Sequence, residues 1–355
     1  MELEALVYSE NELGKLDGKV TNGLVRHSEK YKIVGVIDST KEGLDAGMYL
    51  DGKPNGIPVF KDIYTAIANL TDIPKYFIYG IAPLTPSLAK EDREVLFTAM
   101  KLGMDIVNGL PEFLSDDAVF THLALESGVK IHDVRKPPAR KDLHSFNGQI
   151  KNIKTPVVAV LGTDCAVGKR TTAVELVDAL RASGLKVVFI ATGQTGLLQG
   201  AKYGTPVDML SSGFASGEVE HAIVTADAVE APDVFIVEGQ GSLSHPAFTS
   251  TSAIIRGSMP DAIILQHPPK RKTRCDFPDY EMPEIAQEIA LLELYAQTKV
   301  VAITLNHEEM TEADIDLAII QYEAEYQVPT TDVLKRGCEK LVSVINALLP
   351  QPIII

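Results

Sequence analysis

The hydrophobic pattern of the first 150 residues alternates short apolar runs with amphipathic stretches. The apolar runs predict strands at residues 5–8, 32–37, 76–81, 104–107 and 129–132. The amphipathic stretches between them predict helices at 61–70, 87–102 and 116–127. Such alternation is typical of a doubly wound parallel sheet. The pattern therefore predicts a Rossmann-like α/β domain over residues 1–150.

One acidic residue in this first domain suggests a dinucleotide, but its context does not support one. Asp38 directly follows the second predicted strand, where a dinucleotide fold places a ribose-binding acid. The glycines Gly14, Gly18 and Gly23 do not form the G-x-G-x-x-G fingerprint that should accompany it. We therefore expect a Rossmann-like domain without a nicotinamide cofactor.

A second α/β pattern fills residues 151–355. Strands are predicted at 157–161, 186–190, 233–237, 262–266 and 299–305. One helix is predicted directly after a glycine-rich loop, which spans residues 162–168. Further helices are predicted at 218–229, 284–295, 312–326 and 333–348. The run 157–161 is unbroken and apolar, as in a parallel strand buried on both faces. We therefore expect a second parallel sheet of the P-loop NTPase type.

The segment 135–141, RKPPARK, separates the two patterns. Two consecutive prolines resist helix and central strand, and the flanking charges favour solvent. The segment is either a solvated linker or a place where Arg135 or Arg140 pairs with an anionic substrate.

The glycine-rich loop has the strand–loop–helix context of a phosphate-binding loop. Its backbone N–H groups and the helix N-terminus would bind an anion, and Lys169 would reach the outer phosphates. The expected cofactor-binding residues are Gly162, Thr163, Asp164, Ala166, Val167, Gly168, Lys169, Arg170, Thr171 and Thr172. Cys165, within the loop, is interpreted as a small packing residue.

The loop departs from the common P-loop in two ways. Five residues, not four, separate Gly162 from Gly168. Arg170 follows the lysine, where Ser or Thr normally ligates Mg²⁺. Thr171 could take over the metal position, with Glu238 as the second metal-binding candidate, if the protein depends on Mg²⁺.

Further candidates lie at the ends of the next predicted strands, where ligands bind in open α/β sheets. Glu238 ends an apolar strand. Its carboxylate either binds Mg²⁺ or acts in catalysis, or it merely caps a turn. His245 is either a proton acceptor or a polar surface residue. The basic cluster 270–274 either binds phosphates, including the 3′-phosphate of coenzyme A, or is solvated. The expected substrate-binding residues are Gln194, Thr195, Gly196, Gly239, Gly241, Arg135 and Arg271.

Composition narrows the partners and the location. The net charge of −15 argues against nucleic acid as the partner, because phosphate backbones attract basic surfaces. No segment approaches 18 consecutive apolar residues, so we expect no membrane association. Three cysteines without metal spacing favour a reducing compartment, and we expect a cytoplasmic protein. We also expect a small-molecule substrate and a homo-oligomer.

The second domain resembles dethiobiotin synthetases at three loops, GTDCAVGKRTTA, ATGQTG and VEGQGSLSHPAF. In those enzymes a catalytic lysine stands three residues before the glutamine of the middle loop, and here that position is Ala191. The resemblance implies a phosphate loop of the ATP-dependent ligase type, and with Ala191 in place of the lysine the carbamate chemistry loses its principal cation.

The whole chain is similar to a family of bacterial and archaeal proteins long described as a domain of unknown function. The segments LDGKVTNGLVRHSEKYKIVGVIDS, IHDVRKPP and GTDCAVGKRTTA carry this resemblance, Arg170 included. Some members are described as D-glutamate N-acetyltransferases that use acetyl-CoA. The resemblance implies that the P-loop binds acetyl-CoA or a nucleotide and that a small amino-acid amine is acetylated.

Acyl transfer to an amine needs a base, oxyanion donors and cations for the substrate's carboxylates. Glu238, His245 and Asp164 are the base candidates, amides near Gly239 and Gly241 the donors, and Arg135, Arg140 or Arg271 the anchors. Two other functions stay open. One is a ligase or kinase that uses ATP with Mg²⁺, and the other is a nucleotide-binding regulatory protein.

Overall fold

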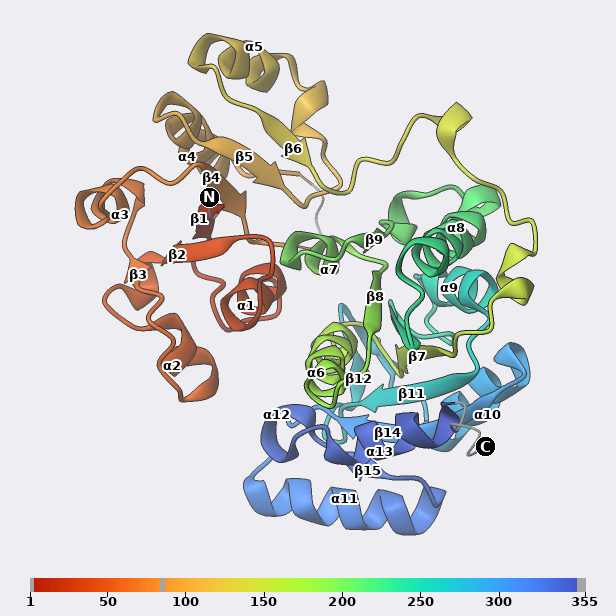
Figure 1. Cartoon of the computed structure of the whole chain (residues 1–355). Coiled ribbons are helices and arrows are strands. Elements are labelled where there is room, and N and C mark those ends of the chain that lie inside the picture. The colour runs from red at the N-terminus through yellow and green to blue at the C-terminus, as the bar shows by residue number, and fades with distance from the viewer. Residues whose placement is uncertain (1–2, 84–86, 350–355) are drawn as a thin grey trace. The chain divides into compact units, whose positions relative to one another are not determined.

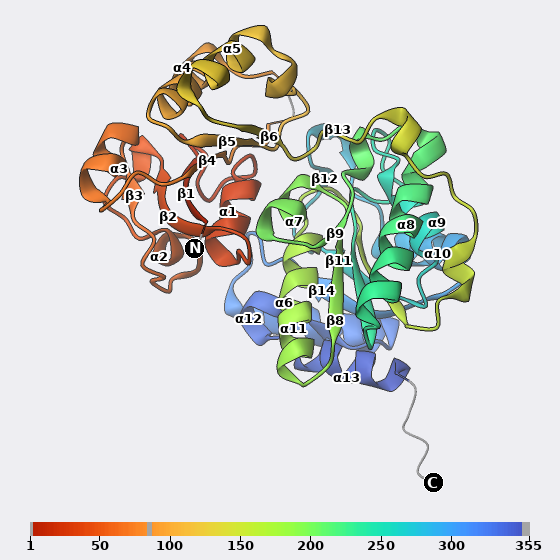
Figure 2. The same cartoon turned by 45° about the horizontal axis from the view of Figure 1, so that its top comes forward.

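The computed structural model describes residues 3–83 and 87–349 and forms two compact α/β units (Figures 1 and 2). The first unit takes the chain up to Pro137 together with Gln194–Ala201, and the second takes Pro138–Gly193 and the chain from Lys202 on. Among the described residues, no helix is both long and apolar enough to cross a membrane.

The first unit contains a parallel sheet of strand order β3-β2-β1-β4-β5-β6. Its strands are β1 (Glu4–Tyr8), β2 (Lys32–Ile37), β3 (Val59–Phe60), β4 (Tyr76–Tyr79), β5 (Asp105–Asn108) and β6 (Ile131–Asp133). Its helices are α1 (Lys19–Arg26), α2 (Ala46–Asp51), α3 (Ile63–Asn69), α4 (Lys90–Lys101), α5 (Ala118–Ser127) and α7 (Gln194–Gln199). Apolar side chains of α3, α4 and α5 pack on one face of the sheet, and those of α1, α2 and α7 pack on the other.

The second unit contains a parallel sheet of strand order β15-β14-β11-β7-β10-β8-β9. Its strands are β7 (Val157–Gly162), β8 (Val187–Ala191), β9 (Tyr203–Gly204), β10 (Val234–Glu238), β11 (Ala262–His267), β14 (Lys299–Leu305) and β15 (Thr330–Thr331). An antiparallel pair, β12 (Thr273–Arg274) and β13 (Phe277–Glu281), follows β11. The helices are α6 (Lys169–Ala182), α8 (Ser212–Glu230), α9 (Ser250–Ser258), α10 (Ile285–Ala296), α11 (Glu312–Tyr326), α12 (Val333–Arg336) and α13 (Glu339–Leu348).

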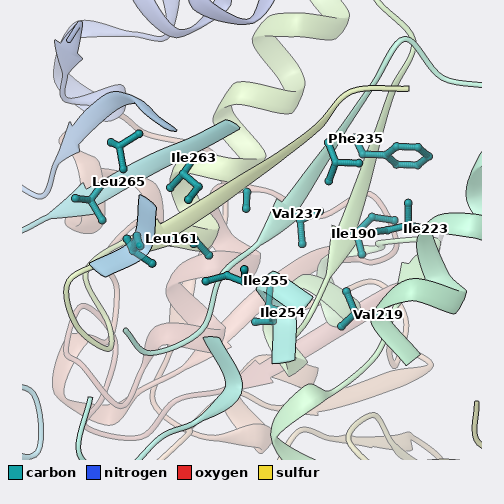
Figure 3. Close-up of a cluster of buried hydrophobic side chains, with 14 of the residues drawn as sticks. Leu161, Ile190, Val219, Ile223, Phe235, Val237, Ile254, Ile255, Ile263 and Leu265 are labelled. Carbon is teal, nitrogen blue, oxygen red and sulfur yellow. The ribbon is translucent and has the colours of Figure 1, made fainter. Parts of the chain in front are cut away.

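The core of the second unit explains why β7 is apolar throughout. Val158 and Val160 pack with α6 and α13 on one face of the sheet. Ala159 and Leu161 pack with α8 to α11 on the other face, and Figure 3 shows Leu161 in this layer with Val219 of α8 and Ile254 of α9. The strand is therefore buried on both sides and fixes the position of the loop that follows it.

The fold prediction is confirmed in class, as two α/β units with parallel sheets, and it differs from the structure in detail. The expected helix at 333–348 is two helices, α12 and α13, because Gly337 has a φ of 76° that a continuous helix cannot contain. Gln194-Thr195-Gly196, the second half of the expected loop ATGQTG, is the start of helix α7, which clusters with the first unit. Helices α1, α2 and α9 were not predicted.

Candidate functional site

The loop between β7 and α6 has the backbone geometry of a phosphate-binding loop. Gly168, the residue before α6, has a φ of 104°, which favours glycine. A Cβ on Gly162 would lie 2.9 Å from Cδ of Lys169, so only glycine lets that side chain fold back over the strand end. The sequence thus positions Lys169 at the mouth of the loop.

Five consecutive carbonyl groups of this loop accept hydrogen bonds from side chains. Arg274 donates to Thr163, Lys169 to Asp164, Arg271 to both Cys165 and Ala166, and Asn306 to Val167. The donor–acceptor distances lie between 2.5 and 3.3 Å. Holding the carbonyls in this way leaves the other side of each peptide, its N–H, available to an anion.

Arg271 is the main support of the loop. Its guanidinium also donates to Oδ2 of Asp164 at 3.1 Å and, at 2.7 Å, to both carboxylate oxygens of Glu308. The N–H groups of Arg271 thus already donate to acceptors of the protein. This argues against the expected role of Arg271 as a substrate anchor. The cluster 270–274 divides similarly: Arg274 is buried behind the loop, and Lys270 pairs with Asp314 at the surface.

Lys169 is buried, and burial lowers the pKa of its ammonium group from the ordinary value. Its Nζ donates to the Asp164 carbonyl at 2.5 Å. The carboxylates of Asp164 and Glu238 oppose the burial effect by stabilising the ammonium ion. An anion in the loop would do the same, so the site favours a negatively charged ligand.

Glu238 stands at the end of β10, next to β7 in the sheet. Its Oε2 accepts the N–H groups of Thr192 at 3.0 Å and Gly193 at 3.3 Å, the residues that follow β8. Burial raises the pKa of the carboxyl group to about 6, although these amides and the charges of Arg170 and Lys169 act in the opposite direction. A carboxyl group with this pKa can exchange a proton near neutral pH.

Asp164 and His245 face one another in the interior. Oδ1 of Asp164 and Nε2 of His245 are buried atoms without a hydrogen bond in the described part of the chain, and they lie 3.5 Å apart. Nδ1 of His245 accepts the N–H groups of Ala247 at 3.1 Å and Phe248 at 3.3 Å. This network assigns the ring proton to Nε2, the nitrogen that lies 3.5 Å from Oδ1 of Asp164.

That tautomer limits what the pair can do. Atoms of Asp164, Cys165 and His245 lie within 4.8 Å of one another, a donor set of the kind that binds transition metals. A metal at Nε2 would need a proton on Nδ1, which instead faces two N–H donors. The same contacts hinder His245 as a base, and burial lowers the pKa of its imidazole. Asp164, in turn, is engaged by Arg271 and by the N–H of Cys275.

The remaining expected residues fall into two groups. Some contact or support the loop, and others lie elsewhere, mostly in the first unit. Thr163 hydrogen-bonds with His267, and the Thr172 hydroxyl donates to Gln266. The Thr171 hydroxyl accepts from Arg170 at 3.5 Å. A Cβ on Gly239 would meet the Val160 carbonyl at 2.3 Å, and Gly241 has a φ of 59°. Gln194, Thr195, Gly196 and Arg135 belong to the first unit, and Arg140 to the second.

Three supporting residues were not predicted from the sequence: Gln266, Asn306 and Glu308. Arg274 was expected as part of the basic cluster 270–274, but its support of the loop was not. Gln266 was the one with a visible signal, because it is a polar residue in the apolar run AIILQ. In the structure its Oε1 accepts from the hydroxyls of Thr172 and Thr304.

The two units define a class of protein that joins a Rossmann-like domain to a P-loop domain. Family models give the same division: residues 39–137 match a Rossmann-like domain, DUF1611_N, and residues 144–342 match a P-loop domain, DUF1611_C. Both are described as domains of unknown function. The chain belongs to the DUF1611 family.

Relatives extend over most of the chain. A D-glutamate N-acetyltransferase of Tritonibacter scottomollicae is 31% identical over 77% of this chain and 82% of its own length. A protein of the same name from a Pseudoalteromonas species is 30% identical over 76% of this chain and 80% of its own length. The crystal structure of a DUF1611 family protein from Anabaena variabilis superposes with a TM-score of 0.89 at 31% identity, covering 98% of this chain and all of that one.

Proposed function

We propose that this protein is an N-acetyltransferase that moves the acetyl group of acetyl-CoA to the amine of a small amino acid of the D-glutamate type. The observation that carries the proposal is the similarity to two relatives named for that activity, each over at least 76% of this chain. The site adds chemical support, because it combines an anion-binding loop with a carboxyl group suited to proton transfer.

The reaction balances with one base from the second unit and with solvent as the other proton donor and acceptor. An ammonium group loses one proton to a base, and the freed amine attacks the thioester carbon. The C–S bond then breaks, the thiolate of coenzyme A takes up a proton, and the new amide nitrogen loses its second proton to solvent. Glu238 is the base candidate whose pKa, about 6, suits this step near neutral pH.

Either substrate offers an anion for the P-loop. The expectation from the sequence is the diphosphate of acetyl-CoA, and the alternative is a carboxylate of the amino acid. An ATP- and Mg²⁺-dependent ligase is a second candidate function, favoured by the placement of the Glu238 carboxylate at the strand end beside the loop.

The test is turnover by the full-length protein with acetyl-CoA and with D-glutamate, L-glutamate or no acceptor. We expect thiol release that depends on the acceptor and an acetylated product identified by mass. Absence of thiol release with every amino acid, together with amino-acid-dependent cleavage of Mg²⁺·ATP, would replace the transferase with the ligase.

A further inference from the structure

We infer that the P-loop of this protein binds the carboxylates of the amino-acid acceptor rather than the diphosphate of coenzyme A, and that Glu238 faces the acceptor's ammonium group. The inference rests on the proposed function and names the substrate that occupies its anion site. Three arguments support it: the charges around the loop, the residue at the position that normally binds Mg²⁺, and the length of the pantetheine arm of coenzyme A.

The charges around the loop complement an acidic amino acid. Lys169 and Arg170 both stabilise the ionised form of Glu238, so the two cations and this carboxylate act on one another. An amino acid with two carboxylates and one ammonium group presents the opposite set of charges. The nearby Arg271 and Arg274 bind Asp164, Glu308 and loop carbonyls, so they support the loop.

A diphosphate fits the charges of Lys169, Arg170 and Glu238 less well than an acidic amino acid does. In P-loop enzymes that bind nucleotides, Mg²⁺ stands between the phosphates and the strand-end carboxylate. Here the hydroxyl position after the lysine is Arg170, and the adjacent Thr171 hydroxyl accepts a hydrogen bond from that arginine. Without a metal between them, the Glu238 carboxylate would repel a diphosphate, whereas it attracts an ammonium group.

Reach gives the third argument. The pantetheine arm of coenzyme A is long, so a diphosphate in the loop would hold the thioester well away from Glu238. With the acceptor in the loop, its amine lies next to the carboxyl group that can take its proton. This second arrangement gives Glu238, positioned by the amides of Thr192 and Gly193, a direct part in the reaction.

The test is two-substrate kinetics of Lys169→Met and Arg170→Met, with Lys154→Met as the matched control. Lys154 is exposed and precedes β7, at the opposite end of that strand from the loop. We expect each site variant to raise the KM for D-glutamate by about tenfold or more, as for the loss of one charge-assisted hydrogen bond. The KM for acetyl-CoA should change less than about twofold. The control should match the parent in both.

A selective rise in the KM for acetyl-CoA would overturn the inference while leaving the transferase intact. Calorimetric titrations of parent and variants with D-glutamate, coenzyme A and Mg²⁺·ATP provide a second readout that does not need turnover. Loss of D-glutamate binding alone in the variants supports the inference, and loss of coenzyme A binding alone contradicts it. A parent that turns over no acetyl-CoA with any amino acid refutes the proposed function itself.

Discussion

The two units have the same kind of sheet but treat its carboxyl edge in opposite ways. In the first unit, the strands β1 and β4 end in Tyr8 and Tyr79, whose hydroxyls both donate to the carboxylate of Asp92. Asp38, at the end of β2, accepts the N–H groups of Leu13 and Thr40 and so fixes two turns. These acids serve the protein's own donors.

In the second unit, the corresponding edge carries the P-loop. Side chains hold the loop carbonyls from 163 to 167, Lys169 begins helix α6, and Glu238 ends the adjoining strand β10. A parallel sheet thus provides an edge where ligands can bind. Whether this edge becomes a ligand-binding site depends on which of its polar groups already form hydrogen bonds or ion pairs within the protein.

The largest effect should follow from breaking the support of the loop. Arg271→Met removes the nearer of two arginines that pair with the buried Asp164 carboxylate, at 3.1 Å against 3.7 Å for Arg274. Removing one partner of a buried ion pair costs about 3–5 kcal/mol, and we expect that loss in the free energy of unfolding of the second unit. Denaturant titration measures it.

Lys270→Met is the matched control for that measurement. Lys270 pairs with Asp314, but both side chains are exposed, at 46% and 34%. A surface pair of this kind contributes about 0–1 kcal/mol. Equal losses for the two variants would mean that Arg271 does not support the loop.

A somewhat smaller loss is expected at the edge of the first unit. Asp92→Ala leaves the buried hydroxyls of Tyr8 and Tyr79 without their acceptor, and we expect about 3 kcal/mol less stability. Asp92→Asn keeps one acceptor and should lose about half as much. Both variants should keep the parent's KM for each substrate. A stable Asp92→Ala variant with greatly changed KM values would show that the first unit also holds a substrate site.

The fold was predictable where burial shows directly in the sequence. The runs at 32–37 and 299–305 match β2 and β14 at both ends, because a largely apolar run follows Lys32 or Lys299 and stops before Asp38 or Asn306. Helix α1 was not predictable from its sequence KVTNGLVR, which contains β-branched residues and Gly23. It is held by tertiary packing of Val20, Leu24 and Val25.

The site was predictable in its position and less so in its roles. Strand, glycine loop and lysine identify the P-loop, and Glu238 follows from its place at a strand end. The sequence cannot show that Arg271 and Arg274 turn inward to loop carbonyls, because that depends on contacts more than 100 residues apart. Nor can it show that the ring of His245 accepts backbone N–H groups, which fixes its tautomer.

An intermediate effect is expected from Glu238→Gln, and it depends on pH. Because folding raises the pKa of Glu238 from 4.5 to about 6, the protonated form is the one that the folded state favours. Its contribution to stability is complete below pH 4.5 and disappears as the pH rises through 6. The parent should therefore lose about 2 kcal/mol across this range. The glutamine variant should lack that change, as unfolding at pH 4.5 and pH 7.5 would show.

The same variant tests the role of Glu238 in turnover. If the carboxylate takes the ammonium proton, the parent's rate should rise with pH through about 6. Glu238→Gln should be slower, and this rise should be absent from its profile. A variant that keeps the parent's rate and pH profile would leave Glu238 with a purely structural part, like that of Asp38 in the first unit.

The smallest effect is expected from Thr171→Val, which separates the two candidate functions. A Mg²⁺-dependent enzyme needs a hydroxyl beside the lysine, and Thr171 offers the adjacent one. This half-buried hydroxyl accepts a long hydrogen bond, 3.5 Å, from Arg170, so its loss should cost less than about 0.5 kcal/mol. Acetyl transfer should stay within about twofold of the parent and be unaffected by a metal chelator, because no step of the proposed reaction uses a metal.

Thr172→Val is the matched comparison for Thr171→Val. Its buried hydroxyl donates to Gln266, and its loss should cost about 1–2 kcal/mol. If Thr171→Val instead abolished a chelator-sensitive activity while remaining as stable as the parent, the loop would be a nucleotide site, and the ligase would be the better description of the second unit.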